Sequence, residues 1–211
     1  KAGRRFLESL VEGGWMVPTW PARHGGRDAD AGEAALIDSA MADYDVADLY
    51  PYGVGLNLVG PVLLDRGTPE QQDRWLRPIA DGSEIWCQMF SEPDAGSDLA
   101  NAGMRAESDG DEWILNGSKV WTSRGVYARW GMCLARTDAS VAKHRGLTMF
   151  AVEMSSPGVE VRPLDQINGD RHFTEVFVSD LRVPDGDRIG DLGAGWSLTV
   201  ETLAHERVTI G

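Results

Sequence analysis

The run FSEPDAGSD at residues 90–98 combines hydroxyl groups with residues that bend the chain and leave the backbone accessible. Ala95 and Gly96 have small side chains, so a ligand can approach the backbone closely there, and Ser91 and Ser97 supply hydrogen-bond donors. These residue types suit a loop that binds the polar edge of a ligand. The alternative interpretation is an ordinary surface loop.

A second segment, Trp121-Thr122-Ser123, ends a strand-like run and offers one aromatic face and two hydroxyls. Asn116-Gly117 separates residues 112–115 from residues 118–121, and Asn-Gly is typical of a type I′ turn because both central residues need positive φ. We therefore expect a β-hairpin that brings the indole beside the first segment. Together the two segments suit a flat cofactor with polar edges, such as an isoalloxazine ring. An ordinary strand end is the alternative interpretation of the second segment.

Composition narrows the class of protein. The 211 residues carry a net charge of −13 and contain no basic stripe, so we expect no nucleic-acid partner. No run of eighteen apolar residues is present, so we expect no membrane span, and no signal peptide is visible. Cys87 and Cys133 lie in apolar runs and suit reduced thiols, which favours a cytoplasmic location; one disulfide is the alternative. No Cys/His cluster has metal-ligand spacing, so we expect no metal.

Hydrophobic periodicity divides the chain into three parts: helices over residues 1–83, short strands over 84–190, and the opening of another helix over 191–211. The strands are many and closely spaced, which predicts a β-barrel or sandwich rather than a βαβ sheet. The fold class is therefore α+β with several domains. We expect helices at residues 4–12, 31–46, 54–64 and from 68 to about 82, and strands at residues 85–90, 102–107, 112–115, 118–122, 129–136, 147–154, 159–163 and 173–183.

The clearest helix start is Thr68-Pro69-Glu70-Gln71. A threonine cap followed by proline at the first helical position, with glutamine three residues after the cap, predicts a capping box. We expect Pro78 and Gly82 to end this helix, and Pro61 to kink the helix before it.

SEPDAGSD followed about two dozen residues later by NGSKVWTS resembles the acyl-CoA dehydrogenase family, and the resemblance extends along the whole chain. Asp94 stands where that family more often has glycine. The resemblance implies an N-terminal helical domain, a middle β domain and the first helix of a C-terminal helical bundle whose remainder is absent. It implies FAD as cofactor, in a site that is incomplete without the C-terminal domain, so we expect this fragment alone to be inactive.

The reaction that the resemblance implies is α,β-dehydrogenation of an acyl-CoA thioester in fatty-acid β-oxidation. A carboxylate removes the α-proton while a hydride leaves the β-carbon for flavin N5. Glu206, directly before Arg207, matches the position of the base in some branches of the family, and the alternative is a carboxylate further along the whole protein. Burial beside an apolar acyl chain raises the pKa of a glutamate toward neutral pH, which suits a residue that accepts and releases a proton.

The resemblance and the residue types assign further roles. We expect Ser91 and nearby backbone N–H groups at the pyrimidine edge of the flavin, Trp121 against its ring and Ser123 at N5. The candidate cofactor-binding residues are Met89, Phe90, Ser91, Gly96, Ser97, Trp121, Thr122 and Ser123. The candidate substrate-binding residues are Ser97, Lys143, His144, Arg145, His205, Glu206 and Arg207. Lys143-His144-Arg145 is a basic triplet suited to coenzyme A phosphates, and a solvated loop is its alternative interpretation.

Two other classes of protein remain as alternatives on the same scaffold. One is a different flavoenzyme, either an acyl-CoA oxidase or a flavin-dependent monooxygenase. The other is a non-catalytic subunit of a heteromeric dehydrogenase. For the dehydrogenase, the resemblance implies an electron-transferring flavoprotein as acceptor and a homodimer or homotetramer, with a heteromer as the alternative.

Overall fold

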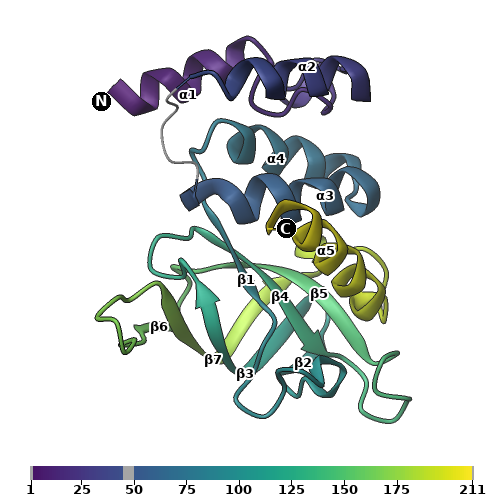
Figure 1. The fold of residues 1–211 in the computed structure, drawn as a ribbon. Helices are drawn as coiled ribbons and strands as arrows, with labels where there is room; N and C mark the ends of the chain where they lie inside the picture. Colours follow the sequence, from purple (N-terminus) through teal and green to yellow (C-terminus); the bar gives the residue numbers. More distant parts are fainter. Residues whose placement is uncertain (1, 45–49, 211) are drawn as a thin grey trace.

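A layer of helices covers one face of a curved, mixed β-sheet (Figure 1). The computed structural model describes residues 2–44 and 50–210. The last helix, α5 (Gly195–Ile210), contacts both the helical layer and strand β5 (Leu147–Glu153), at one side of the molecule. The expected order of helices, strands and a final helix is therefore confirmed.

In the part of the chain that the structure describes, four α-helices precede the sheet: α1 (Ala2–Glu12), α2 (Ala31–Met41), α3 (Gly60–Arg66) and α4 (Pro69–Ala80). The helix expected at residues 31–46 ends at Met41, and its last two expected residues lie outside the described ones. The helix expected at residues 54–64 is present: helical residues 53–54 lead into a π-helical turn, Gly55–Val59, which continues as α3, with Pro61 in the first turn of α3.

Helix α4 starts as predicted and ends within the predicted range, between Pro78 and Gly82. Thr68 Oγ1 accepts from the Gln71 backbone at 3.3 Å, and Gln71 Oε1 accepts from the Thr68 backbone at 3.1 Å, which confirms the capping box. The helix continues through Pro78 and ends at Ala80, two residues before Gly82, whose φ is +68°. The turn after it closes through the Asp81 N–H, which donates to Arg77 O at 3.0 Å, so the missing proline donor does not stop the helix.

Within the described residues, eight strands form one sheet in the order β6-β7-β3-β2-β4-β5-β8, with β1 pairing with β4 in parallel. Besides β5, the strands are β1 (Trp86–Met89), β2 (Arg105–Asp109), β3 (Glu112–Ser123), β4 (Trp130–Arg136), β6 (Val159–Pro163), β7 (Phe173–Pro184) and β8 (Arg188–Ile189). The sheet curves around its own core, since Trp113 of β3 contacts Phe150 of β5 at 5.6 Å between ring centroids. This is the barrel-like β domain that the strand spacing predicts.

The predicted hairpin at Asn116-Gly117 is wrong. Residues 112–123 form the single strand β3, and the hairpin lies one turn earlier, where Asp109 of β2 pairs with Glu112 of β3. Asn116 and Gly117 form an irregularity in the pairing of β3 with β7. The Asn116 amide binds Asp180 on β7 through two hydrogen bonds of 2.9 and 3.2 Å.

Gly117 is needed in β3 for its backbone and for its lack of a side chain. Its φ is +152°, and an added Cβ would lie 2.9 Å from Met104 Cα. The extra residue of this irregularity lies on β7, and Gly117 is required opposite it because its φ is positive and Met104 leaves no room for a Cβ.

Two buried clusters hold the layers together. One lies within the curved sheet, and the other joins the helices to β1, β4 and β5 and includes Leu198 of α5. At its centre are Trp75 of α4, Trp86 of β1 and Trp130 of β4, with ring centroids 5.6–5.8 Å apart. Three indoles bury a large apolar area, so the helical layer and the sheet share one core.

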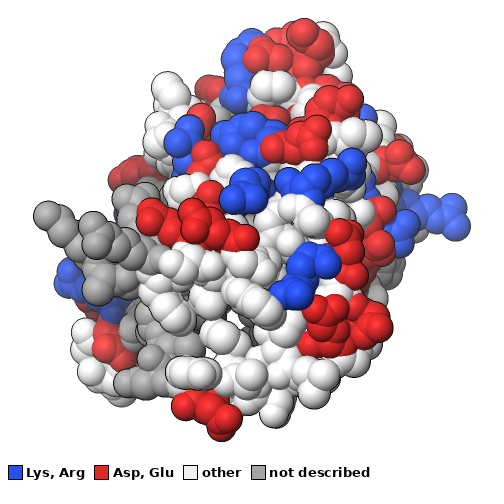
Figure 2. Space-filling model, turned by 90° about the horizontal axis from the view of Figure 1, so that it is seen from above, with Lys and Arg blue, Asp and Glu red and all other residues white. Residues whose placement is uncertain are grey.

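Charged side chains on the helical face lie in neighbouring pairs of opposite sign (Figure 2). Arg27 is 2.9 Å from Glu33, Arg66 is 3.3 Å from Glu201 on α5, and Arg74 is 3.1 Å from Glu84. Such exposed pairs contribute about 0–1 kcal/mol each to stability, so the buried clusters dominate the packing of the helices.

Cys87 and Cys133, both within the described residues, are free thiols buried in the core of the sheet. Burial raises the pKa of Cys133 to about 11, and burial together with the neighbouring Cys133 raises the pKa of Cys87 further. Because the thiolate is the nucleophile, the native protein should not react with iodoacetamide at pH 8 at either position. Peptide mass spectrometry after brief alkylation checks this, and the same treatment in denaturant should modify both. Rapid modification of either thiol in the native protein would contradict the burial described.

Candidate functional site

The two segments singled out in the sequence meet at one place on the sheet. The loop at residues 90–98 follows β1, and Trp121-Thr122-Ser123 ends β3. The Val120 N–H donates to Ser91 O at 2.9 Å, which joins the loop to the strand directly. The segments therefore come together as expected, although β3 reaches the loop as a continuous strand and not through the predicted hairpin.

The loop after β1 is closed by its own backbone. Glu92 and Ala95 exchange two hydrogen bonds of 3.0 and 3.1 Å, with Pro93 and Asp94 exposed at the tip. Apart from Gly96 itself and its two chain neighbours, no described residue has an atom within 4 Å of the position that a Cβ on Gly96 would occupy, so the loop is open on that side. Open space beside a glycine suits a ligand that approaches the backbone.

Trp121 has an unusual backbone and an unusual exposure. Its φ is +60°, in the left-handed region that a bulky residue rarely adopts, and 60% of its surface is exposed. The indole contacts Phe173 edge-on, with the ring centroids 5.7 Å apart. A backbone of this kind is less stable by about 1–3 kcal/mol and is frequent where a side chain is held for binding. Trp121 thus offers a large aromatic face to a ligand.

The hydroxyls after the indole differ in their surroundings. Thr122 is buried, and its Oγ1 has no hydrogen-bond partner among the described residues, while its carbonyl accepts from Thr174 Oγ1 at 2.9 Å. Ser123 is half-buried, as is Ser91 at the start of the loop. Ser91, Trp121 and Ser123 therefore lie on neighbouring segments with surface still accessible, whereas the Thr122 side chain faces the interior.

Met89 and Phe90 stand at the entry to the loop, and both side chains are buried in the core. Contact of either residue with a cofactor would therefore be through the backbone. Ser97 is exposed beyond Gly96.

Sequence reasoning missed a buried ion pair beneath these residues. Lys119 has no exposed surface, and its Nζ lies 2.7 Å from Glu92 Oε1 and 3.0 Å from Phe90 O. The Glu92 carboxylate also accepts from the backbone N–H groups of Gly103 and Met104, at 2.6 and 2.9 Å. The sequence carried one signal for this burial. Side chains alternate between the two faces of a strand, and Lys119 is an even number of residues from Leu115, so both lie on the buried face.

Removal of one partner of such a pair leaves a buried charge and costs about 3–5 kcal/mol, whereas an apolar replacement of both partners is often neutral. The pair therefore contributes little net stability compared with apolar packing. Its clearest effect is to fix which residues of the loop lie beside which residues of β3.

The loop at residues 137–146 is anchored against the loop after β1. Lys143 Nζ contacts both oxygens of Asp98, at 2.6 and 2.7 Å. The Arg136 guanidinium donates to Ala100 O at 2.8 Å, Ala102 O at 2.9 Å and Lys143 O at 3.1 Å. Arg145 is exposed. The basic triplet therefore lies beside the loop at residues 90–98, and its lysine is already paired with Asp98.

Helix α5 carries the other predicted substrate residues. Glu206 is half-buried, and its neighbours His205 and Arg207 are exposed. Trp196, at the other end of the helix, contacts the His144 ring of the basic triplet at 4.9 Å between centroids. The start of α5 therefore lies near the basic triplet, and Glu206 lies about three helical turns further along.

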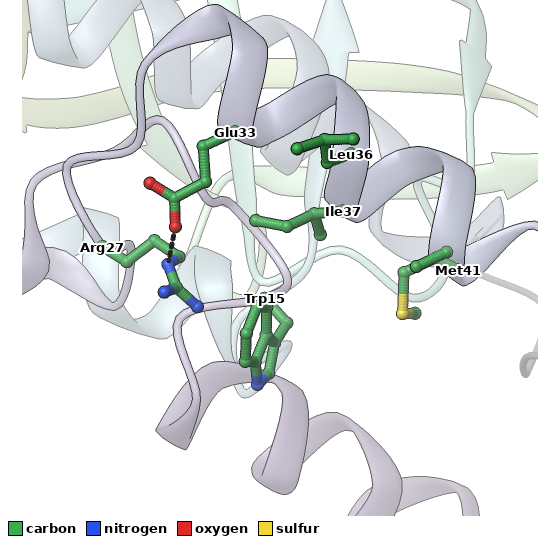
Figure 3. Close-up of a pocket in the computed structure, with 7 residues that line it drawn as sticks. Trp15, Arg27, Glu33, Leu36, Ile37 and Met41 are labelled. Carbon is green, nitrogen blue, oxygen red and sulfur yellow. Dashed lines mark ion pairs between the residues drawn. The ribbon is translucent and has the colours of Figure 1, made fainter.

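A separate open groove of about 270 Å³ lies between α2 and the loop after α1 (Figure 3). Arg27 stands over the Trp15 ring at 4.1 Å and pairs with Glu33. None of the residues predicted for the cofactor or the substrate lines this groove. Its lining residues are Trp15, Arg27, Glu33, Leu36, Ile37, Ala40 and Met41.

Within residues 2–44 and 50–210, no group of three or more His, Cys, Asp or Glu could hold a metal ion in this part of the chain. None of the helices in it is long and apolar enough to cross a membrane.

Comparison with known proteins gives matches along nearly the whole chain. A sequence model of the acyl-CoA dehydrogenase N-terminal domain matches residues 1–83, and one of the acyl-CoA dehydrogenase middle domain matches residues 87–181. The chain is 45% identical over 204 residues to acyl-CoA dehydrogenase FadE34 of Mycobacterium tuberculosis, covering 96% of this chain and 28% of that protein. It is 40% identical over 214 residues to acyl-CoA dehydrogenase IpdE1 of Mycolicibacterium smegmatis, covering 97% of this chain and 54% of that protein.

Solved structures give the same result. The chain is similar to the Tcur3481-Tcur3483 steroid ACAD with a TM-score of 0.83 and 31% identity, covering 99% of this chain and 53% of that one. The chain thus spans about half the length of IpdE1 and of this solved chain, and less of FadE34. With its two domain matches and these relatives, the chain belongs to the acyl-CoA dehydrogenase family and carries that family's N-terminal and middle domains.

Proposed function

We propose that the whole protein is an FAD-dependent acyl-CoA dehydrogenase that forms an α,β double bond in an acyl-CoA thioester. The observation that carries the proposal is the junction at Val120 and Ser91, which sets an exposed indole on a strained backbone beside an open, hydroxyl-bearing loop. Membership of the family supports the same reaction.

The residues at this junction fit a flavin. Trp121 would pack its ring against the flavin, and Ser91 and the backbone around Gly96 would bind polar edges of the cofactor. The Ser123 hydroxyl would donate a hydrogen bond at N5, while Thr122, with its buried side chain, would contribute its backbone. When bound, FAD supplies an acceptor for the hydride that leaves the substrate. Groups from outside these 211 residues would complete the site.

At the substrate end, the basic triplet would face the coenzyme A phosphates. Arg145 is the most suitable of the three, because Lys143 is already held by Asp98 at 2.6 Å and a phosphate would compete with that carboxylate. His144 packs against Trp196 and would help to fix the shape of the loop. Ser97, exposed after Gly96, would contact either the phosphates or the thioester arm.

For proton abstraction we propose Glu206 as the base, with a carboxylate from outside this chain as the alternative. Glu206 is half-buried near the end of α5, and its carboxylate would remove the α-proton of the substrate. His205 and Arg207 would contact the substrate beside it.

The acceptor of the electrons would be an electron-transferring flavoprotein, and the protein would act as a homo-oligomer or a heteromer. A heteromer is favoured by the similarity to the Tcur3481-Tcur3483 steroid ACAD, whose name contains two chains. The same similarity makes a steroid-derived acyl group a candidate substrate beside ordinary fatty acyl groups.

The visible absorbance of the purified full-length protein tests the function. The protein should carry FAD, and one member of a panel of short-chain, long-chain and steroid-derived acyl-CoA compounds should bleach it without oxygen. Rapid reoxidation of the bleached protein by oxygen would favour an acyl-CoA oxidase, and FAD content with no bleaching by any compound would contradict the proposed reaction.

The same assay separates the two candidate bases. Glu206→Gln should slow bleaching on the order of a hundredfold or more while FAD stays bound, because the carboxylate that accepts the proton is lost. The exposed Glu160→Gln on β6 is the matched control. Near-normal bleaching in Glu206→Gln would show that the base is a carboxylate outside this chain.

Replacement of the two flavin-facing residues should have effects of different kinds. Trp121→Ala should weaken FAD retention, because the ring contact is lost. Ser123→Ala should keep FAD bound and slow its reduction by roughly a fewfold to tenfold, since one neutral hydrogen bond is worth about 1 kcal/mol. FAD content after gel filtration and anaerobic reduction rates measure the two effects. Equal loss of FAD in both variants would contradict the role of Ser123.

A further inference from the structure

Lys119 lies directly beneath the candidate flavin contacts and has no access to solvent. Its ammonium group binds Phe90 O and the Glu92 carboxylate, which are the residues on either side of Ser91. The next residue, Val120, binds the carbonyl of Ser91 itself. Two consecutive residues of β3 thus hold three consecutive residues of the loop.

The strand changes its pairing immediately after Lys119. Lys119 pairs with Val176 of β7 and Thr122 pairs with Thr174, so β3 has one more residue than β7 between these pairs. The extra residue makes a β-bulge, and Trp121 lies in it with φ of +60°. A strained residue keeps such a backbone only where its neighbours are fixed.

The neighbours of Trp121 are fixed on both sides. After it, Thr122 is buried and its carbonyl accepts from Thr174. Before it, the strongest anchor is Lys119, a charged donor at 2.7 Å from a carboxylate that is itself held by two backbone N–H groups.

We propose that Lys119 is a positioning residue for the flavin site: paired with Glu92, it holds the bulge that turns Trp121 outward and sets it beside Ser91. The inference rests on the proposed function, since it assigns Lys119 a role through residues expected to contact FAD. A lysine serves this role better than an apolar residue because its bonds to Phe90 O and Glu92 fix one register of strand and loop.

The test uses the full-length protein with Lys119→Met, which keeps the length of the side chain and removes its charge. FAD affinity, measured by quenching of flavin fluorescence, should fall on the order of tenfold, and the visible bands of the FAD that remains bound should shift. The control is Arg162→Met, which removes an exposed cation paired with Glu160 on the same sheet and should change neither quantity.

A double-mutant cycle separates positioning from a general loss of stability. If Lys119 acts through Trp121, Lys119→Met should lower FAD affinity less than about twofold in a Trp121→Ala background. An equal loss in both backgrounds, or unchanged affinity and spectrum in Lys119→Met alone, would overturn the inference.

Lys119→Met leaves the Glu92 carboxylate buried without its cation, so its folding must be checked separately. Lys119→Met/Glu92→Gln removes both charges, and its thermal unfolding midpoint without FAD should recover toward that of the unchanged protein. Its FAD affinity should stay low, and recovery of affinity together with stability would overturn the positioning role. Absence of FAD binding in the unchanged protein would instead contradict the proposed function, and with it this inference.

Discussion

The contact between the loop after β1 and the end of β3 is the constraint on which the candidate site depends. A backbone hydrogen bond from Val120 to Ser91 sets the distance, and the buried pair of Lys119 and Glu92 sets the register. These bonds join segments about 30 residues apart, which local sequence preferences alone would not bring together. The curved sheet makes the contact possible, because β1 pairs with β4 and β3 pairs with β2 in the same sheet.

Around this contact the protein combines rigid support with exposed binding groups. The side chains of Met89, Phe90 and Thr122 are buried and belong to the core, while the indole of Trp121 is largely exposed. A binding group on a rigid strand is held more precisely than one on a free loop, and the left-handed backbone of Trp121 has the form expected of a residue held for function. The helical layer is fixed to the same sheet through the three central tryptophans.

The sequence predicted the parts of this account that depend on local chemistry. The capping box at Thr68 and the short strands follow from residue types and spacing, and both are present, while the two segments of the candidate site meet as expected. The hairpin at Asn116-Gly117 was wrong because an Asn-Gly pair alone does not distinguish a turn from an irregular position inside a strand, and only the distant partners Asp180 and Met104 decide between them. Lys119 was missed because its carboxylate partner is 27 residues away and a lysine in a strand ordinarily faces solvent.

The central claim is that the two segments form one wall of a flavin site, and a crystal structure of the full-length protein with bound FAD tests it most directly. We expect the Trp121 indole to contact the isoalloxazine ring at about 4 Å, with Ser91 and Ser123 within hydrogen-bond distance of its polar atoms. FAD bound elsewhere on the protein, or bound with Trp121 facing away from the ring, would contradict it.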